Sequence, residues 1–334
     1  MNLTIVIKEL DIEEFRGVRK LAKPIKLKKF NIIIGRNNTG KTTILEALYL
    51  LATPSGYTAP LTEVSRLDFI TQLHGGKSCL IYGYSGTARI RYRLFNDEVV
   101  TVTLTAGTLE SIVINNREAY VETYIDYIAK LLNISKDEVH NLTLYIPNST
   151  EFLKELRNKL KEPTTWSTLT KYGAHRKIVT ELINPTVYDK YTEILIERNE
   201  LKLRKEVSEE IGPLYIHVAD LGDGIERICL TALALEYLKP RLVLWDDMEV
   251  AAHPGLIEVV MKWLTSKNWQ VVITTHSIDV LLELTYQSPE DSQVIILRKT
   301  PDDIVEHTTL TPNELEEYFN RGIDIRKLID LLEL

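Results

Sequence analysis

Short apolar runs alternate with helical patterns at both ends of the chain. Runs of four or five residues that are mostly apolar and often β-branched, bounded by polar or turn residues, predict buried strands, and they lie at 30–34, 214–218, 242–245, 270–274 and 293–297. Apolar residues at helical spacing predict helices at 43–51, 225–238, 256–264 and 278–284. Strands that alternate with helices predict an α/β fold with a mostly parallel sheet covered on both faces.

The pattern differs before and after the first of these strands. Residues 3–10 alternate apolar and polar and predict an edge strand, and residues 11–27 predict a turn and a second strand. Residues 78–114 are rich in Thr, Tyr, Val and Arg and contain repeated turn signals, so they predict an antiparallel β-meander.

Helical periods dominate from residue 115 to residue 208. A capping box (Ser-Lys-Asp-Glu) at 135–138 begins one helix, and residues 151–161 and 188–205 look like charged amphipathic helices. No heptads are sustained, so we expect no long coiled coil. A second capping box (Thr-Pro-Asn-Glu) at 311–314 begins a helix near the end of the sequence.

A Gly-x-x-x-x-Gly-Lys-Thr pattern lies between the strand at 30–34 and the helix at 43–51. In this context the glycines let backbone N–H groups turn inward onto a phosphate. Lys41 can then reach the β- and γ-phosphates, and the Thr42 hydroxyl can ligate Mg²⁺. The alternative is a glycine-rich turn that binds nothing. The residues expected to bind the nucleotide here are Gly35, Arg36, Asn37, Asn38, Thr39, Gly40, Lys41, Thr42 and Thr43.

Two carboxylates, Asp246 and Asp247, end the apolar strand at 242–245. The strand would deliver Asp246 to the carboxyl edge of the sheet beside the phosphate loop, where it can hold Mg²⁺ through water. Asp247 can orient or deprotonate an attacking water. The alternative is a strand that ends in a solvated acidic turn.

A histidine, His276, follows the strand at 270–274. At the same sheet edge it can hydrogen-bond the γ-phosphate or the attacking water, whereas the alternative is a capping or packing histidine. We therefore expect Lys41, Asp247 and His276 to be the catalytic residues.

Two glycines precede the predicted helix at 225–238, within Gly222-Asp223-Gly224. They leave the N-terminus of that helix open to an anion. We expect these three residues to contact the nucleotide as well.

These motifs, in this order along the chain, resemble the ABC-type P-loop ATPases. The run Asp-Asp-Met-Glu-Val-Ala-Ala-His-Pro at 246–254 is similar to the D-E-P-E-x-x-L-H-P run of a soluble branch of these ATPases. That branch includes the RecF-like and OLD-family (overcoming lysogenization defect) proteins, and Phe15-Arg16-Gly17 also matches it. The resemblance covers residues 1–50 and 214–334.

The resemblance implies a P-loop NTPase fold with an ABC ATPase head, in which a mixed central sheet carries an antiparallel β subdomain and a helical insertion. The expected segments are 1–114 (phosphate loop and β-meander), 115–212 (helical insertion or arm) and 213–334 (signature, Walker B strand and switch histidine).

The resemblance also implies a mechanism. Two heads face in opposite directions and trap two Mg-ATP molecules, so that the phosphate loop of one head meets the glycine-rich signature of the other. ATP closes this homodimer and hydrolysis reopens it. The arm would select a partner in DNA repair or mobile-element defence, and the stretch after His276 is too short for a nuclease domain, so any nuclease would be a separate protein.

Three departures from the family pattern modify this expectation. The usual signature serine is Gly222, with the charge of Asp223 beside it, and the usual catalytic glutamate is Asp247, which is one methylene shorter. No glutamine loop is evident, and the candidates for it are Gln72 and the turn at 75–77. Hydrolysis could therefore be slow.

Composition narrows the partners and the compartment. The net charge of −7 gives no global basic footprint for nucleic acid, although lysines between 20 and 29 and basic residues between 198 and 205 leave DNA binding open. Acidic residues interleave with the second cluster, which favours a solvated face. Two cysteines suggest no disulfide framework, and no apolar run approaches the roughly 20 residues of a membrane helix. We expect a cytoplasmic protein.

Two other classes of function stay open. One is a switch that binds ATP, dimerises and scarcely hydrolyses it, which Asp247 favours. The other is a transporter-type ATPase subunit, which the missing glutamine loop and the long insertion disfavour.

Overall fold

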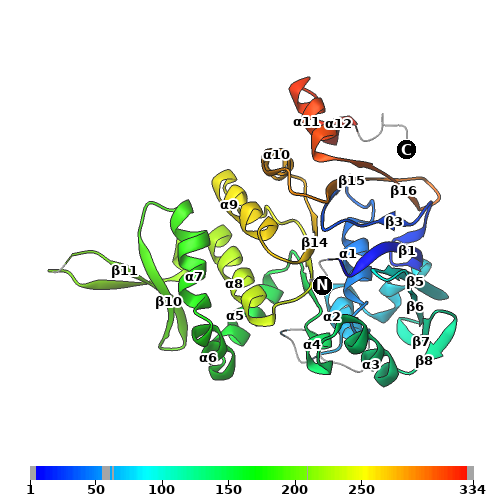
Figure 1. The fold of residues 1–334 in the computed structure, drawn as a ribbon, viewed down its shortest axis with the longest axis horizontal. Coiled ribbons are helices and arrows are strands. Elements are labelled where there is room, and N and C mark those ends of the chain that lie inside the picture. Colours follow the sequence, from blue (N-terminus) through cyan, green and yellow to red (C-terminus); the bar gives the residue numbers. More distant parts are fainter. Residues whose placement is uncertain (1–4, 55–60, 62–63, 209, 329–334) are drawn as a thin grey trace. The chain divides into compact units, whose positions relative to one another are not determined.

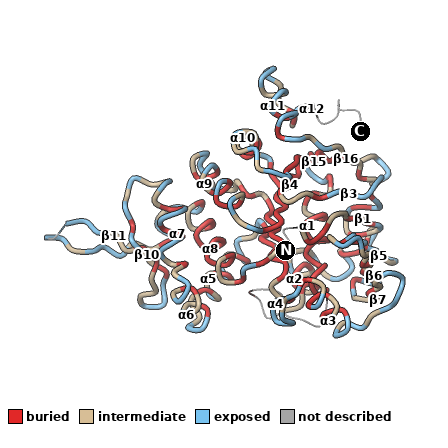
Figure 2. Tube along the Cα trace, viewed as in Figure 1, coloured by how far each residue is buried: buried red, intermediate tan, exposed pale blue. Residues whose placement is uncertain are grey.

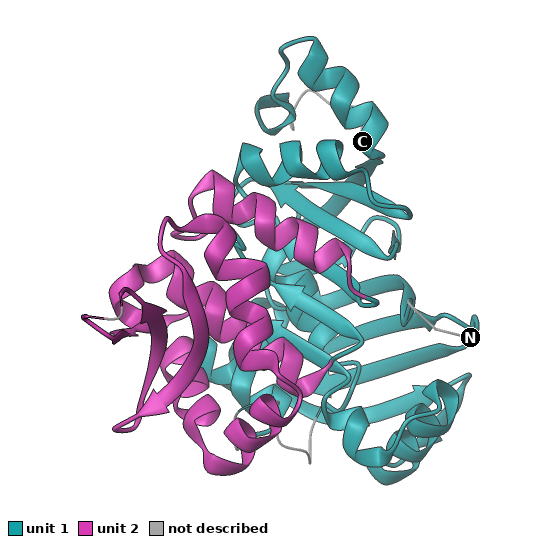
Figure 3. Cartoon of the chain, turned by 60° about the vertical axis from the view of Figure 1, so that its left-hand side comes forward, with its two compact units in different colours: residues 1–147, 240–248, 268–334 teal, residues 148–239, 249–267 magenta. Residues whose placement is uncertain are grey.

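The computed structural model describes residues 5–54, 61, 64–208 and 210–328. The chain forms two compact units (Figure 3). Unit 1 comprises residues 1–147, 240–248 and 268–334, and unit 2 comprises residues 148–239 and 249–267. Residues 115–147, which the sequence groups with the arm, thus lie in unit 1. The three-part division at 114 and 212 stays a prediction.

A mixed sheet of 13 strands among the described residues forms the centre of unit 1 (Figure 1). Its order is β8-β7-β6-β5-β1-β2-β16-β15-β4-β14-β13-β9, and β3 pairs with β1. The strands are β1 (Ile7–Phe15), β2 (Val18–Leu21), β3 (Ile25–Lys26), β4 (Phe30–Gly35), β5 (Thr87–Leu94), β6 (Val99–Thr105), β7 (Thr108–Ile114), β8 (Arg117–Ala119), β9 (Thr143–Ile146), β13 (Leu242–Trp245), β14 (Gln270–Thr274), β15 (Ser292–Lys299) and β16 (Ile304–Leu310).

The helices of unit 1 are α1 (Lys41–Tyr49), α2 (Arg66–Leu73), α3 (Val121–Leu132), α4 (Lys136–His140), α10 (Ile278–Gln287), α11 (Pro312–Asn320) and α12 (Ile325–Leu328), with short 3₁₀ turns η1 (Lys77–Leu80) and η2 (Tyr82–Tyr84). Both expected capping boxes are present: Ser135 with Glu138 begins α4, and Thr311 with Glu314 begins α11.

The five parallel strands β15, β4, β14, β13 and β9 carry the core of unit 1. Four of them are buried along their whole length, and β15 is buried except at its last two residues, of which Arg298 is exposed and Lys299 is intermediate (Figure 2). Such strands are covered on both faces, which is why they read as continuous apolar runs rather than alternations. Helix α1 packs on β4, β9, β13 and β14. All five strands point their carboxyl ends to one edge of the sheet.

The antiparallel part of unit 1 confirms the predicted meander, since β5, β6, β7 and β8 pair in sequence. The predicted edge strand is wrong in position. β1 begins at Ile7 and runs to Phe15, through residues that we expected to turn, and it is interior because it pairs with β2 and β3 on one side and β5 on the other. Residues 3 and 4 of that prediction lie outside the described residues.

Unit 2 contains most of the helical segment. Its elements are α5 (Thr150–Lys161), α6 (Pro163–Lys171), α7 (Ala174–Ile178), the π turn η3 (Val179–Ile183), the 3₁₀ turns η4 (Asn184–Thr186) and η5 (Val218–Leu221), β10 (Tyr191–Glu197), β11 (Glu200–Glu206), β12 (Pro213–His217), α8 (Asp223–Leu238) and α9 (Pro254–Thr265).

The helix expected at 188–205 is instead the hairpin β10–β11. Its turn is Arg198-Asn199, and both residues have positive φ (51° and 62°), as a tight two-residue hairpin turn requires. β12 adds to this hairpin as a third antiparallel strand. The strand at 214–218 therefore belongs to a small separate sheet and not to the parallel one.

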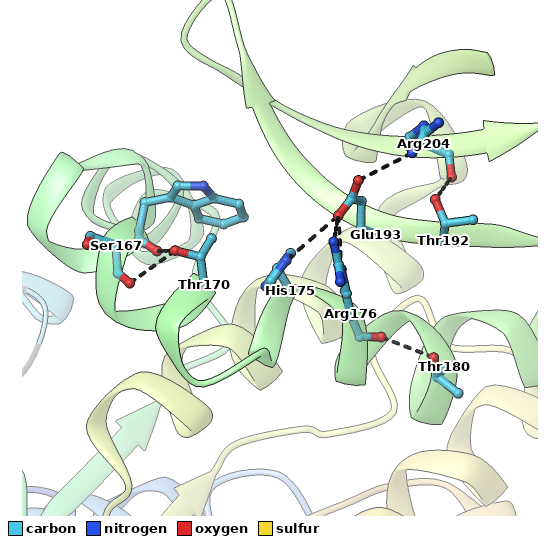
Figure 4. A network of polar contacts seen from close by, with 9 residues as sticks. Ser167, Thr170, His175, Arg176, Thr180, Thr192, Glu193 and Arg204 are labelled. Carbon is cyan, nitrogen blue, oxygen red and sulfur yellow. Dashed lines mark hydrogen bonds and ion pairs between the residues drawn. The ribbon is translucent and has the colours of Figure 1, made fainter. Parts of the chain in front are cut away.

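The carboxylate of Glu193 on β10 lies close to several basic side chains (Figure 4). Glu193 accepts from Arg176 at 3.1 Å, and Arg204 and His175 lie 3.7 and 3.8 Å from its carboxylate. Lys202 is likewise paired, with Glu197 at 2.7 Å. These charges are neutralised within the hairpin region, which favours the solvated-face interpretation over a phosphate-backbone contact.

Candidate nucleotide site

The phosphate loop leaves β4 at Gly35 and enters α1 at Lys41. A Cβ at Gly35 would lie 2.5 Å from Thr39 Oγ1 and 3.0 Å from the Leu297 carbonyl oxygen, so only glycine fits. Gly40 has φ of +95°, and a Cβ there would meet Val18 at 2.9 Å. Both glycines are thus required by the turn that aims the first N–H groups of α1 at an anion.

Lys41 lies within this loop and is 8% exposed. Its Nζ donates to the carbonyl oxygens of Gly35 and Arg36 at 3.1 and 3.0 Å. Thr39 Oγ1 also donates to the Arg36 carbonyl, at 2.9 Å. The ammonium group is therefore held inside the loop by two neutral carbonyl oxygens. An arriving phosphate would replace them with a charged acceptor, which forms a stronger hydrogen bond.

The hydroxyl of Thr42 and the carboxylate of Asp246 meet across the sheet edge. Thr42 Oγ1 donates to Asp246 Oδ2 at 2.9 Å, and Thr274 Oγ1 donates to Asp246 Oδ1 at 2.6 Å. β13 delivers Asp246 here because β13 and β14 run parallel to β4. The structure therefore brings together Thr42 and Asp246, the two expected metal ligands.

Burial raises the pKa of Asp246 above its ordinary value, and the neighbouring charges of Asp247 and Glu46 act in the same direction. The hydrogen bonds from Thr274 and Thr42 oppose this shift. A buried carboxylate next to other acids costs free energy, and a nearby cation would relieve that cost. The electrostatics of the site thus favour a bound cation.

Asp247 lies beside this pair with φ of 46°, in the left-handed region. Its main-chain N–H donates to Thr274 Oγ1 at 2.8 Å, so Thr274 fixes both acids at once. Left-handed backbone at a non-glycine residue persists where surrounding contacts hold it, often at functional sites.

His276 follows β14 and is exposed. A cavity of about 600 Å³ lies between this histidine and the phosphate loop, and its lining includes Gly35, Arg36, Asn37, His276 and Arg326. The structure therefore brings the histidine and the loop to one cavity, within unit 1.

Three residues that the site analysis of the sequence missed form a polar cluster behind the loop. Glu46 of α1 is fully buried. Its carboxylate forms an ion pair with Arg16 and accepts a hydrogen bond from His74 Nε2 at 2.7 Å. Arg16 Nη2 lies 3.1 Å from His74 Nδ1. Since an arginine can only donate, Nδ1 accepts and Nε2 carries the proton. The motif Phe15-Arg16-Gly17 was the available signal.

A second cavity, of about 480 Å³, lies next to this cluster. Its lining includes Arg16, Asn38, His74, Tyr82 and Lys299. It joins the phosphate loop to the antiparallel part of unit 1.

The glycine-rich segment lies in unit 2. Gly222 is the N-cap of α8, which begins at Asp223 rather than at the expected Ile225. A Cβ at Gly224 would lie 2.1 Å from the Ala251 carbonyl oxygen, so the glycine lets residues 251–252 approach α8. A cavity of about 590 Å³ is lined by Gly222, Asp223, Gly224 and other residues of unit 2.

His253, whose role the sequence left open, caps α9 by accepting the N–H of Gly255 at 3.2 Å. Gln72, a glutamine-loop candidate, is exposed on α2. Ile146, at the end of β9, pairs with Trp245, so β9 ends at the same sheet edge as Asp246.

The described residues contain no helix long and apolar enough to cross a membrane. Nor do they contain a group of three or more His, Cys, Asp or Glu side chains placed to hold a metal ion. One carboxylate and one hydroxyl is a small donor set, of the kind that binds Mg²⁺ together with substrate phosphates.

A glycine-rich loop between the buried strand β4 and a helix, with an acid at the end of β13, a parallel strand that β14 separates from β4, is typical of a P-loop ATPase domain. Residues 6–99 match the family described as "AAA ATPase domain". Residues 125–283 match the family described as "AAA domain, putative AbiEii toxin, Type IV TA system". Two parts of the chain thus match P-loop ATPase domains of the AAA type.

Solved structures show the same fold. The Smc head domain from Pyrococcus furiosus, determined with an extended coiled coil and the C-terminal domain of ScpA, has a TM-score of 0.64 at 12% identity, over 95% of this chain and 99% of that one. The SMC head domain from Thermotoga maritima has a TM-score of 0.52 at 11% identity, over 92% and 99%.

A sequence relative is the uncharacterized protein MJECL10 of Methanocaldococcus jannaschii, 32% identical over 102 residues. This match covers 30% of the present chain and 46% of the relative, so it spans about half of that protein.

The family matches confirm the predicted P-loop ATPase domains, and the structural matches confirm the α/β fold, which resembles an SMC head and has a mixed central sheet and a small antiparallel sheet. The assignment of individual residues to nucleotide, metal and catalysis stays a prediction.

Proposed function

We propose that this protein binds Mg-ATP at the loop 35–43, dimerises head to tail around two nucleotides, and hydrolyses ATP to reopen the dimer. The observation that carries the proposal is the 2.9 Å hydrogen bond from Thr42 to Asp246. It joins a hydroxyl from the phosphate-loop helix to a carboxylate from a separate strand, beside Lys41. A turn that binds nothing has no need of this arrangement.

The donor set fits Mg²⁺, because both atoms are hard oxygen ligands, and because burial, which raises the pKa of Asp246, makes a nearby cation favourable for its charged form. Thr42 and Asp246 would hold the ion, Asp246 through water. When bound, Mg²⁺ would neutralise charge on the β- and γ-phosphates.

The chain's own residues would supply the remaining chemistry. Lys41 would exchange its two carbonyl acceptors for phosphate oxygens. Asp247 would orient a water for attack on the γ-phosphorus and accept its proton, while the bond from that phosphorus to the bridging oxygen of ADP breaks. His276 would hydrogen-bond the γ-phosphate.

The nucleoside end of ATP would occupy the cavity beside Asn38. Two features support this position: the cavity begins at the phosphate loop, and Tyr82 lines it, which offers an aromatic face to a base. Glu46, Arg16 and His74 would then fix the wall of the base pocket and α1 together.

The signature would act across the dimer. The segment 222–224 and the cavity that it lines lie in unit 2, whereas the phosphate loop lies in unit 1. A second head would present its α8 N-terminus to the γ-phosphate. Gly222 provides no hydroxyl for this contact. The hairpin β10–β11 and the helices α5–α7 would determine which partner protein is bound. A separate nuclease or other effector, in repair or defence, is the proposed partner.

The mass of Asp247→Asn in solution tests the dimer. Light scattering should give twice the 38.3 kDa of the chain with Mg-ATP and a single copy with Mg-ADP. The matched control is the double variant Lys41→Ala, Asp247→Asn, which should stay single with both. A single copy of Asp247→Asn in both nucleotides would overturn the head-to-tail dimer.

Hydrolysis needs its own test because Asp247 is shorter than the usual glutamate. Phosphate release by the wild type in a single turnover, lost in Asp247→Asn, would establish the ATPase. Dimerisation without phosphate release by the wild type would instead identify a non-hydrolysing ATP switch.

A further inference from the structure

Helix α12 lies beside the histidine that follows β14, within unit 1. Arg326 Nη1 donates to the main-chain carbonyl oxygen of His276 at 2.7 Å. The same guanidinium donates from Nε and Nη2 to the two carboxylate oxygens of Asp324, at 2.9 and 2.6 Å. A planar guanidinium bound on both edges has a fixed direction, unlike a lysine ammonium.

Asp324 is a firm anchor for this arginine. The Arg326 guanidinium holds the pKa of Asp324 below its ordinary value, so the carboxylate is charged at neutral pH. Asp324 Oδ1 also accepts the main-chain N–H of Arg326 at 3.1 Å. The pair is partly buried, with side chains 30% and 16% exposed, which reduces screening by solvent.

The main chain on both sides of His276 is held as well. Thr275 N–H donates to the Ile33 carbonyl at 3.2 Å, from the strand that enters the phosphate loop. Ser277 N–H donates to Thr275 Oγ1 at 2.9 Å. With Arg326 on the carbonyl between them, the backbone of His276 is fixed while its imidazole is exposed.

We propose that Arg326 is a positioning residue for His276, which makes α12 part of the ATP site. Arg326, Asp324 and His276 line the same cavity as Gly35 and Asn37 of the phosphate loop. Neither family match reaches α12, because the matches end at residues 99 and 283. The proposal rests on the proposed function for the role of His276, but the link itself can be tested without nucleotide.

The first test is hydrogen exchange of the nucleotide-free protein. Arg326→Ala should raise exchange about tenfold in peptides covering 275–279, which equals a loss of about 1.4 kcal/mol in local stability. Arg326→Lys should restore part of the protection. The matched control is Arg321→Ala, an exposed arginine at the end of α11, which should leave 275–279 unchanged. Unchanged exchange in Arg326→Ala would overturn the link.

The second test is kinetic. Arg326→Ala should lower kcat about tenfold and leave the Kd for ATP within about twofold, because the phosphate loop is untouched. In a His276→Ala background, removing Arg326 should have no further effect on kcat. An additive loss in the double variant, or an unchanged kcat in the single one, would overturn the positioning role.

The exchange and kinetic measurements distinguish a failure of the proposed function from a failure of the positioning role of Arg326. If the wild type neither binds nor hydrolyses ATP, the proposed function fails, while the exchange result still decides whether Arg326 holds the His276 backbone. If the wild type hydrolyses ATP and Arg326→Ala matches it in kcat, only the positioning role fails.

Discussion

Thr274 donates its hydroxyl hydrogen to Asp246 at 2.6 Å, from the neighbouring parallel strand. The same hydroxyl oxygen accepts the main-chain N–H of Asp247 at 2.8 Å. One fully buried side chain thus fixes both acids that the proposed mechanism uses, although nothing in the sequence singled it out.

Thr274→Val keeps the shape and removes this hydroxyl. It leaves a buried carboxylate and a main-chain N–H each short of a partner, so we expect a loss of about 1–3 kcal/mol in the free energy of unfolding. ATP hydrolysis should fall at the same time. Urea unfolding and phosphate release measure the two effects. Thr274→Ser keeps the hydroxyl and should retain more of both, and a valine variant as stable and active as the wild type would contradict the assigned role.

Substitution of either signature glycine, Gly222 or Gly224, by alanine should disrupt the signature segment, for a different physical reason in each case. Gly222 has φ of 94° and ψ of 153°, a region that is essentially restricted to glycine, so Gly222→Ala should cost about 1–3 kcal/mol through backbone strain alone. Gly224→Ala should displace residues 251–252, because its Cβ would clash with the Ala251 carbonyl. ATP-dependent dimerisation should be lost in both, while ATP binding at unit 1 persists.

The control for these variants is Gly173→Ala. This glycine also has positive φ, 70°, with no atom within 4 Å of its Cβ position, but it lies in the milder left-handed helical region. It should lose less stability than Gly222→Ala and keep dimerisation. Equal losses of dimer in all three variants would show that general destabilisation of unit 2 is the cause.

Glu46→Gln tests the cluster behind the phosphate loop. The change leaves the largely buried guanidinium of Arg16 without its counter-charge, so we expect a loss of about 3–5 kcal/mol in the free energy of unfolding. The contrasting variant is Glu9→Gln, which breaks the more exposed pair with Arg93 and should cost under about 1 kcal/mol. Chemical denaturation of the two variants measures the difference, and similar losses would argue against a buried ion pair.

The core of the fold was predictable because its strands are covered on both faces. Continuous apolar runs such as β4 and β14 are difficult to misread when a phosphate-loop pattern or a helix follows. The hairpin β10–β11 was misread because its charges recur at helical spacing. The alternation Leu201-Lys202-Leu203-Arg204 and the Asn at residue 199 were the correct signal, of period two around a turn.

The site residues that lie within sequence motifs could be predicted from the sequence. Thr42 and Asp246 are 204 positions apart in the sequence, and their proximity follows from parallel strands that end at one edge. Glu46, Thr274 and Arg326 were beyond sequence reasoning. Each acts through contacts with residues distant in sequence, and a lone residue of a common type carries no pattern.

A buried histidine on β16 should make stability depend on pH. His307 is 5% exposed, and burial, with a smaller contribution from the charge of Lys23, lowers its pKa to about 4. In the unfolded chain the pKa of histidine is about 6.5. Between these values the unfolded state binds a proton that the folded state does not. The contribution of His307 is therefore fully present above pH 6.5 and is lost as the pH falls towards 4.

His307→Gln removes this titration. Between pH 7.5 and 4.5 the wild type should lose about 2 kcal/mol more in the free energy of unfolding than the variant does. His140 and His175, whose pKa values burial also lowers, titrate in both proteins and cancel in the comparison. Asp246 acts in the opposite direction, because its raised pKa favours the folded state as the pH falls, and it cancels likewise. Urea unfolding at the two pH values measures the difference, and parallel losses would show that folding does not lower the pKa of His307.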